Sequence, residues 1–333
     1  MELTVVIPTF NRRKVLEQTL RRLAEQQTDT PYEVIVVDDG STDDTAPFAE
    51  SLAAELPIPV RVLSQQNSGP ASARNKGAAL AAGKVLLFLG DDIWARPDLL
   101  ERHLAFHRSR PDDRTALLGR VVWAPEASPS PFMEWLGTTG LLFAYESIAE
   151  PSAVRANMFY TGNVSLKTSF FRSQDGFDEA FADAALEDTE LGLRLAAAGM
   201  TLVYDADAIG EHYHPLDLAD TLRRLSKIGK SARILEARSP GWTWFPTWQD
   251  PSRRGPLTLA KEALLTAFHA VGFRPARIRH STWWLLCQQS FQSGYTTGVA
   301  ETRTDFIGER LRRYAGRDRA TRIDSRSRLG EMG

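Results

Sequence analysis

Pairs of carboxylates stand at the ends of two apolar runs in the first third of the chain. Asp38 and Asp39 follow VIVV, and Asp91 and Asp92 follow LLFLG. Such runs predict buried strands, and the carboxyl ends of strands in an open parallel sheet are where ligands bind. Acids gathered at one edge repel one another unless a cation lies among them. The pattern therefore predicts a divalent metal ion that carries a diphosphate.

The two acids of each pair are expected to bind different partners, because adjacent side chains of an extended segment diverge. Of Asp91 and Asp92, one can bind Mg²⁺ or Mn²⁺ while the other bonds a ribose hydroxyl or positions a loop. Asp38 suits a sugar hydroxyl, and Asp39 suits an N–H group of a nucleotide base. Taken alone, Asp38 and Asp39 also fit an ordinary turn followed by a helix cap.

A third pair of acids, Glu187 and Asp188, begins a helix that is expected over 187–198. The positive end of the helix dipole favours the ionised form of such an acid. An ionised carboxylate can act as a general base toward an acceptor hydroxyl. Simple capping of the helix explains the same two residues equally well.

Two further stretches carry candidate ligands. NSGPASARNKG (67–77) joins a turn to a helix start, where phosphate binding is favoured and Arg74 or Lys76 adds charge. Helix capping is the alternative for this stretch. HYH (212–214) follows an expected strand over 202–209 and offers an imidazole as a metal ligand or as a structural group.

Alternating strands and helices must position these groups. The alternation predicts βαβ units and an α/β fold with a mainly parallel open sheet flanked by helices. Asn11 is expected to cap the first helix. The proline-rich and aromatic segment 124–156 predicts a loop or short helix of the kind that forms lids. Strands are expected over 3–7, 33–37, 60–63, 85–89, 162–167 and from 202, and helices over 12–26, from 43 or 44 to 56, 71–82 and 187–198.

Composition indicates a folded protein of two units. The chain has 333 residues, of which 43% are hydrophobic and 25% charged, so a sizeable core is expected. One cysteine, Cys287, excludes an internal disulfide and fits a reducing compartment. No apolar run approaches the roughly 20 residues that span a bilayer. The N-terminus reads as a strand rather than a signal peptide, and a cytoplasmic location is expected.

The last third differs in charge from the rest. Residues 1–210 hold 19 Lys and Arg against 30 Asp and Glu, whereas residues 211–333 hold 21 against 12. Residues 220–238 predict a basic amphipathic helix, which together with the tryptophans that follow is typical of a peripheral contact with a membrane, here its inner face. Packing on the catalytic domain, or stacking of the tryptophans on sugars, are the alternatives. The aromatic residues concerned are Trp242, Trp244, Phe245, Trp248, Trp283 and Trp284.

Six motifs together resemble glycosyltransferase family 2, the mostly inverting nucleotide-sugar transferases of the GT-A fold. They are VVIPTFNR, VIVVDDGSTDDT, NSGPASARNKG, FLGDD, TGNVSLK and EDTELGLRLAAAG, in this order. The resemblance covers residues 1–215 and implies a GT-A catalytic domain there. A mostly helical region is expected over 216–333, where it contacts acceptor, membrane or another subunit.

The resemblance also implies roles for individual residues. Asp92 is expected to bind the metal, Mn²⁺ or Mg²⁺, together with His212, and Asp188 to be the catalytic base. Gly90 replaces the first acid of the family's triple-aspartate element, which leaves Asp91 for the ribose. The donor nucleotide site is expected to comprise Pro8, Thr9, Asp39, Arg74 and Asp91.

The function that follows is metal-dependent, inverting transfer of a sugar from a nucleotide-diphosphate donor, expected to be a UDP-sugar, to an acceptor hydroxyl. A carbohydrate or lipid-linked acceptor and a place in cell-surface polysaccharide or glycolipid synthesis are expected, with no nucleic-acid partner. A catalytically silent sugar-nucleotide-binding or scaffold protein of the same fold is the alternative. A Rossmann dehydrogenase is excluded because no GxGxxG follows the first strand.

Overall fold

The computed structural model describes residues 1–183, 185–240, 242, 256, 260–261, 263–265 and 276–297. The chain divides into two compact units. The first comprises Met1–Pro215 with Ile234–Trp242, and the second comprises Leu216–Arg233 with Thr243–Gly333. Among the described helices, none combines the length and the apolar character that crossing a membrane requires. The tryptophan-rich stretch after Trp242 lies outside the described residues.

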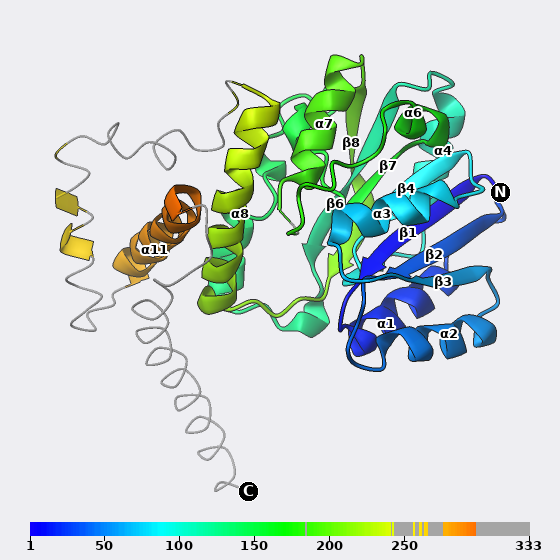
Figure 1. Ribbon diagram of the computed structural model, residues 1–333, viewed down its shortest axis with the longest axis horizontal. Coiled ribbons are helices and arrows are strands. Elements are labelled where there is room, and N and C mark those ends of the chain that lie inside the picture. The colour runs from blue at the N-terminus through cyan, green and yellow to red at the C-terminus, as the bar shows by residue number, and fades with distance from the viewer. Residues whose placement is uncertain are drawn as a thin grey trace, which may run out of the picture. The chain divides into compact units, whose positions relative to one another are not determined.

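The first unit is built on one eight-stranded sheet with the order β3-β2-β1-β4-β7-β6-β8-β5 (Figure 1). Its first four strands are parallel, as expected from the βαβ pattern. β7 is antiparallel to both of its neighbours, and β5 is antiparallel to β8, so the sheet is mixed. The strands are β1 Leu3–Thr9, β2 Tyr32–Asp38, β3 Val60–Ser64, β4 Val85–Leu89, β5 Ile93–Ala95, β6 Thr115–Trp123, β7 Asn163–Lys167 and β8 Thr201–His212.

Helices cover both faces of this sheet, because the strand side chains alternate between two apolar clusters. On one face, Leu16, Leu52 and Leu104 from three helices pack on strand residues such as Val5. On the other face, the remaining helices pack on the alternate strand residues such as Val6. The helices are α1 Arg13–Ala24, α2 Thr45–Glu55 and α4 Leu99–Ser109 on the first face, and α3 Pro70–Ala79, α6 Thr168–Ser173 and α7 Glu187–Ala197 on the second.

The start of α1 corrects one expectation. Asn11 does not cap the helix, which begins at Arg13 and has no side-chain cap. Asn11 instead adopts a left-handed backbone (φ 53°). Its side-chain oxygen accepts from the backbone N–H groups of Thr42 and Asp43, at 2.8 and 3.3 Å. Because asparagine tolerates this conformation and bonds nearby backbone readily, it ties the loops after β1 and β2 together.

A buried polar network connects the strands β6, β7 and β8. β6 and β8 change register between Gly119 and Arg120, and the Asn163 amide donates to the carbonyls of Arg120 and Ala208 in this gap, at 3.3 and 2.9 Å. A Cβ on Gly119 would lie 2.2 Å from Asn163 Nδ2, so only glycine fits there. This network therefore holds β7 against the irregular pair β6 and β8.

The segment 124–156 contains α5, Pro131–Thr138, and two 3₁₀ turns, Pro125–Ala127 and Tyr145–Ser147. This agrees with the expected loop with a short helix. A third 3₁₀ turn, Ala156–Met158, leads into β7.

The second unit contains a close helix pair. α8 spans Leu218–Arg238, and its part up to Arg233 belongs to the second unit. This part packs on α11, Ala276–Thr297. A Cβ on Gly294 would lie 1.8 Å from the Ser226 carbonyl oxygen, and Ser290 Oγ donates to the Leu222 carbonyl at 2.6 Å. Leu225 is also buried. The apolar side of the expected amphipathic helix is therefore used in packing.

Candidate active site

The acidic turn after β4 is the centre of the site. Thr9 Oγ1 donates to Asp91 Oδ2 at 2.8 Å, and Thr19 Oγ1 donates to the Asp91 carbonyl at 2.7 Å. Burial, and next the charge of Asp92, raise the pKa of Asp91 to about 6. Burial also opposes the charge of Asp92, but His212, His214 and Arg12 lower the pKa of its carboxyl well below the usual range. Asp92 is therefore the acid of the pair that ionises more readily.

The end of β8 brings two histidines to Asp92. His212 Nε2 lies 3.3 Å and His214 Nδ1 lies 3.0 Å from Asp92 Oδ2. Tyr213 holds this segment, because its N–H donates to the Asp92 carbonyl at 2.8 Å and its ring stacks on Trp94 at 4.3 Å. Residues two apart on an extended strand share a face, which explains why both imidazoles converge.

The ligand atoms of Asp92, His212 and His214 all lie within 4.8 Å of one another. One carboxylate oxygen and two imidazole nitrogens fit a divalent transition ion such as Mn²⁺ better than Mg²⁺, which prefers oxygen ligands. His212 Nδ1 is buried and has no hydrogen-bond partner among the described residues. Its ring stacks on Trp123 at 5.2 Å and 8°. The sequence indicated Asp92 and His212, and the structure adds His214.

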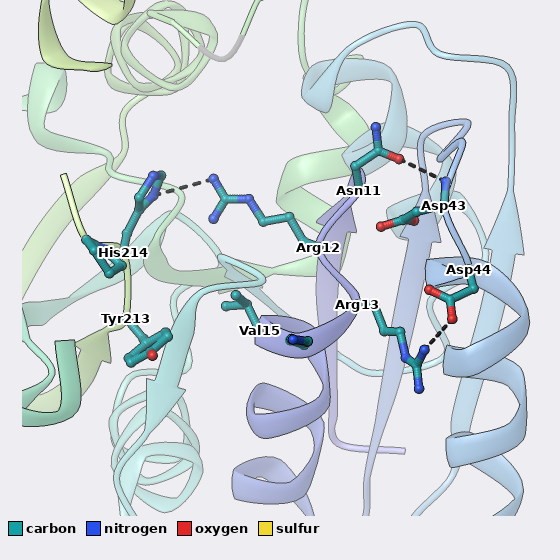
Figure 2. Close-up of a pocket in the computed structure, with 10 residues that line it drawn as sticks. Asn11, Arg12, Arg13, Val15, Asp43, Asp44, Tyr213 and His214 are labelled. Atoms are coloured by element: carbon teal, nitrogen blue, oxygen red, sulfur yellow. Dashed lines mark hydrogen bonds and ion pairs between the residues drawn. The ribbon is translucent and has the colours of Figure 1, made fainter. Parts of the chain in front are cut away.

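Arg12 is a charged neighbour that the motif analysis missed. Its guanidinium Nη1 lies 2.7 Å from Asp92 Oδ2 and 3.9 Å from Asp91 Oδ1. The side chain enters from the loop before α1 and reaches His214, as Figure 2 shows. It borders a cavity of about 580 Å³ that Arg13, Asp44 and His214 also line. Its place directly after Asn11, in the turn that ends β1, was the available signal.

The expected base-binding acid, Asp39, already holds a loop. Asp39 Oδ1 accepts from Gln65 Nε2 at 2.8 Å and from the Ser68 N–H at 2.9 Å. Oδ2 accepts from the Gly69 N–H at 2.8 Å. Among the described residues Gly69 is the one donor to Oδ2, which leaves a lone pair for another donor. Neighbouring Asp38 has a buried Oδ1 without a partner among the described residues. Pro8 and Thr9 pair with β2 beside these acids.

Arg74 and Glu187 form a buried ion pair between α3 and α7, at 2.9 Å. The Arg74 side chain is 9% exposed and that of Glu187 is 5% exposed. Arg74 Nε and Glu187 Oε2 have no partners among the described residues. The ion pair thus joins Arg74, which is expected at the donor nucleotide, to Glu187, which directly precedes the expected catalytic base Asp188.

Asp188 lies in the first turn of α7, half-buried, after Leu186 in a left-handed conformation. Its Oδ1 accepts from the Thr189 N–H at 2.7 Å. Burial chiefly, with a contribution from the Asp188 charge, raises the pKa of Tyr160 to about 12. The Tyr160 ring packs on Phe143 at 5.3 Å. Asp188 therefore stands beside an aromatic cluster that continues into the segment 124–156.

A second cavity, of about 330 Å³, links this aromatic cluster to the histidines. His212, Trp123, Phe143 and Tyr145 line it. Tyr145 also packs on Tyr160, at 5.8 Å. The charged residues that line this second cavity are Arg120, Glu134 and Glu146.

Residues 4–122 match the model of glycosyl transferase family 2. The chain is 33% identical over 232 residues to a validoxylamine A glucosyltransferase of Streptomyces hygroscopicus subsp. jinggangensis, which covers 62% of this chain and 54% of the relative. The chain thus spans about half the length of that curated relative.

Two solved structures share the fold. A mannosyltransferase from Pyrobaculum calidifontis in complex with GDP-Man and Mn²⁺ matches with a TM-score of 0.60 and 21% identity, covering 89% of this chain and 86% of its own. S. aureus TarS 1–349 in complex with UDP matches with a TM-score of 0.53 and 18% identity, covering 89% and 90%. The fold is the GT-A type that the motifs implied.

The N-terminal part of the chain, residues 4–122, thus matches the family that the six motifs resemble, glycosyl transferase family 2.

Proposed function

We propose that the protein transfers a sugar from a nucleotide-diphosphate donor to an acceptor hydroxyl, with inversion at the anomeric carbon. The observation that carries this proposal is an aromatic cavity that connects the group of possible metal ligands to Tyr160, which the charge of the helix-start carboxylate Asp188 influences. His212 belongs to that group and lines the cavity. The cavity's aromatic residues in turn contact Tyr160, beside Asp188.

In this proposal the donor nucleotide lies over the carboxyl ends of β1, β2 and β4. An N–H group of the nucleotide base donates to the remaining lone pair of Asp39 Oδ2, and a ribose hydroxyl bonds Asp91. Structural relatives support a nucleotide-sugar donor: TarS is described with UDP-GlcNAc, and the mannosyltransferase with GDP-Man. A UDP-sugar is the proposed donor. The full proposed donor site comprises Pro8, Thr9, Asp39, Arg74 and Asp91.

Asp92, His212 and His214 would hold a divalent cation, which when bound supplies positive charge to the diphosphate leaving group. The mannosyltransferase was solved with Mn²⁺, the ion that this mixed donor set favours. Asp92 is suited to this position because its carboxyl stays ionised near neutral pH.

Asp188 is the proposed general base. It removes the proton of the acceptor hydroxyl as that oxygen attacks the anomeric carbon, so a single displacement inverts the configuration. Trp123 and Phe143 offer apolar faces for an acceptor ring, since aromatic side chains present a large apolar surface. We place a carbohydrate or lipid-linked acceptor of cell-surface glycan synthesis in this cavity, with the enzyme on the cytoplasmic side of the membrane.

The test is a screen of nucleotide sugars for release of nucleoside diphosphate, with Mn²⁺ and with a chelator. Release from some donors should depend on the metal, and Asp92→Ala should abolish metal-dependent donor binding in calorimetry while the melting curve is retained. Asp92 lies in the turn between β4 and β5 and belongs to neither apolar cluster, so the fold should survive. Donor binding without any turnover would instead favour a catalytically silent nucleotide-sugar-binding protein.

A further inference from the structure

The Arg12 side chain occupies the place on Asp92 that a cation would take. Its Nη1 lies 2.7 Å from Asp92 Oδ2, the oxygen that both histidines approach. Its Nη2 lies 3.4 Å from His214 Nδ1. The guanidinium therefore contacts two of the three groups that could hold a metal.

Arg12 and a divalent ion would compete for this oxygen, which both histidines also approach. Arginine keeps its charge at any pH that the fold survives, so a metal at Asp92 would face a like charge at contact distance. In addition, His214 Nδ1 offers one proton or one lone pair, and it cannot donate to Asp92 and accept from Arg12 together. Only one of the two contacts of His214 Nδ1, with Asp92 or with Arg12, can therefore be a hydrogen bond while Arg12 stays there.

The backbone of Arg12 is fixed, whereas its side chain has space to move. The Arg12 N–H donates to Thr45 Oγ1 at 3.1 Å, and preceding Asn11 is tied to the loop after β2. The Arg12 side chain is 31% exposed and borders the cavity of about 580 Å³ shown in Figure 2. Rotation of the side chain alone can thus free Asp92.

A nucleotide diphosphate offers Arg12 a replacement partner. The planar guanidinium matches phosphate oxygens in a bidentate geometry. The diphosphate must approach Asp92 if the two share a metal. An anion at that position would draw Arg12 off the carboxylate and open the carboxylate to the metal.

We propose that Arg12 is an internal counter-cation of Asp92, which the metal displaces and the donor diphosphate accepts, so that metal and nucleotide bind cooperatively. This inference rests on the proposed function. Because coupling between two ligands is reciprocal, the nucleotide should tighten Mn²⁺ binding by the same factor as Mn²⁺ tightens nucleotide binding.

The test measures Mn²⁺ binding rather than turnover. Free Mn²⁺ is followed by electron paramagnetic resonance at constant ionic strength, with and without UDP, for the wild type and Arg12→Gln. Arg13→Gln is the matched control, since Arg13 lines the same cavity but pairs with Asp44.

We expect UDP to tighten Mn²⁺ binding to the wild type by about tenfold or more, within the usual range of allosteric coupling. Arg12→Gln should bind Mn²⁺ alone about tenfold more tightly than the wild type, and UDP should tighten Mn²⁺ binding by a smaller factor than in the wild type, since only the direct contact between metal and diphosphate then couples the two ligands. Arg12→Lys, which keeps the charge, should fall between them. Arg13→Gln should behave like the wild type.

Unchanged or weaker Mn²⁺ binding by Arg12→Gln without UDP, at an unchanged melting temperature, would overturn the inference. If Arg12→Gln does not fold, Arg12→Lys decides alone: its Mn²⁺ affinity must exceed that of the wild type. Asp92→Asn tests the proposed metal site separately from the role of Arg12. If the wild type shows no Mn²⁺ binding that depends on Asp92, the proposed metal site fails and the inference fails with it.

Discussion

Acidification from pH 7 to pH 5 is expected to destabilise the first unit through two buried histidines of α4. His103 is completely buried, and His107 is 3% exposed. His103 contacts Ser165 Oγ at 2.7 Å and Asn163 Oδ1 at 2.9 Å, and His107 Nε2 contacts the same Ser165 Oγ at 2.9 Å.

One arrangement of protons satisfies this network, and both imidazoles are neutral in it. The Asn163 amide group donates to two carbonyls, so its oxygen accepts from His103 Nε2–H. Ser165 then donates to His103 Nδ1 and accepts from His107 Nε2–H. A second proton on His103 would face the Ser165 hydroxyl proton. Burial is the largest cause that lowers the pKa of His103 to about 4 and that of His107 to about 3.

The magnitude follows from linkage between protonation and folding. Both pKa values are lower in the folded state than the ordinary value of 6.5, so the unfolded chain binds more protons below that pH. The stability is therefore complete above the unfolded pKa and falls as the pH drops toward the folded values. At pH 5 the loss is about 2 kcal/mol for each histidine and about 4 kcal/mol for both. That is a large part of a typical folding free energy of about 5–15 kcal/mol.

The assay is urea unfolding at pH 7 and pH 5, for the wild type, His103→Gln and the control His280→Gln. Glutamine can bond Ser165 or Asn163 but does not titrate, so His103→Gln should lose about 2 kcal/mol of the pH dependence. His280 is exposed on α11, and its removal should leave the dependence unchanged. The same difference between the two pH values in His103→Gln and in the wild type would refute the reasoning.

Three other substitutions test the site and the core. Asp188→Asn keeps the size of the side chain and much of its capping ability but cannot accept a proton, so sugar transfer should fall about 10²- to 10⁴-fold with an unchanged melting temperature; near-normal transfer would exclude the role of base. Glu187→Gln leaves Arg74 charged and buried without its partner, so chemical denaturation should show a loss of about 3–5 kcal/mol; no loss would mean that water reaches Arg74. Gly294→Ala places a methyl group against the Ser226 carbonyl, so the second unit should lose protection from proteolysis, while unchanged digestion would contradict the tight helix crossing.

Local patterns were sufficient to predict the half of the sheet formed by β1 to β4. Alternating apolar runs and helical spacing identified these strands and α1 to α3, and their positions agree with the structure to within a few residues. The same patterns placed Asp91 and Asp92 directly after β4 and Glu187 at the start of α7. Hydrophobic periodicity is a property of neighbouring residues, so the chain reveals it without knowledge of the fold.

Tertiary structure decided which of these groups meet. Arg74 and Glu187 are 113 residues apart and Arg12 and His214 are 202 residues apart, and no local pattern indicates either contact. The expectation that Asn11 caps α1 was wrong because its side chain bonds a loop from another strand. The sequence did not predict that β7 runs antiparallel to its neighbours, and it did not predict α4, β5 or β6. Pairing between distant strands depends on packing and long-range hydrogen bonds, which local patterns do not reveal. The sequence by itself thus determined the elements and their acidic ends, whereas only long-range packing decided the partners of each charge, and with them which carboxylate of the Asp91 and Asp92 pair ionises more readily.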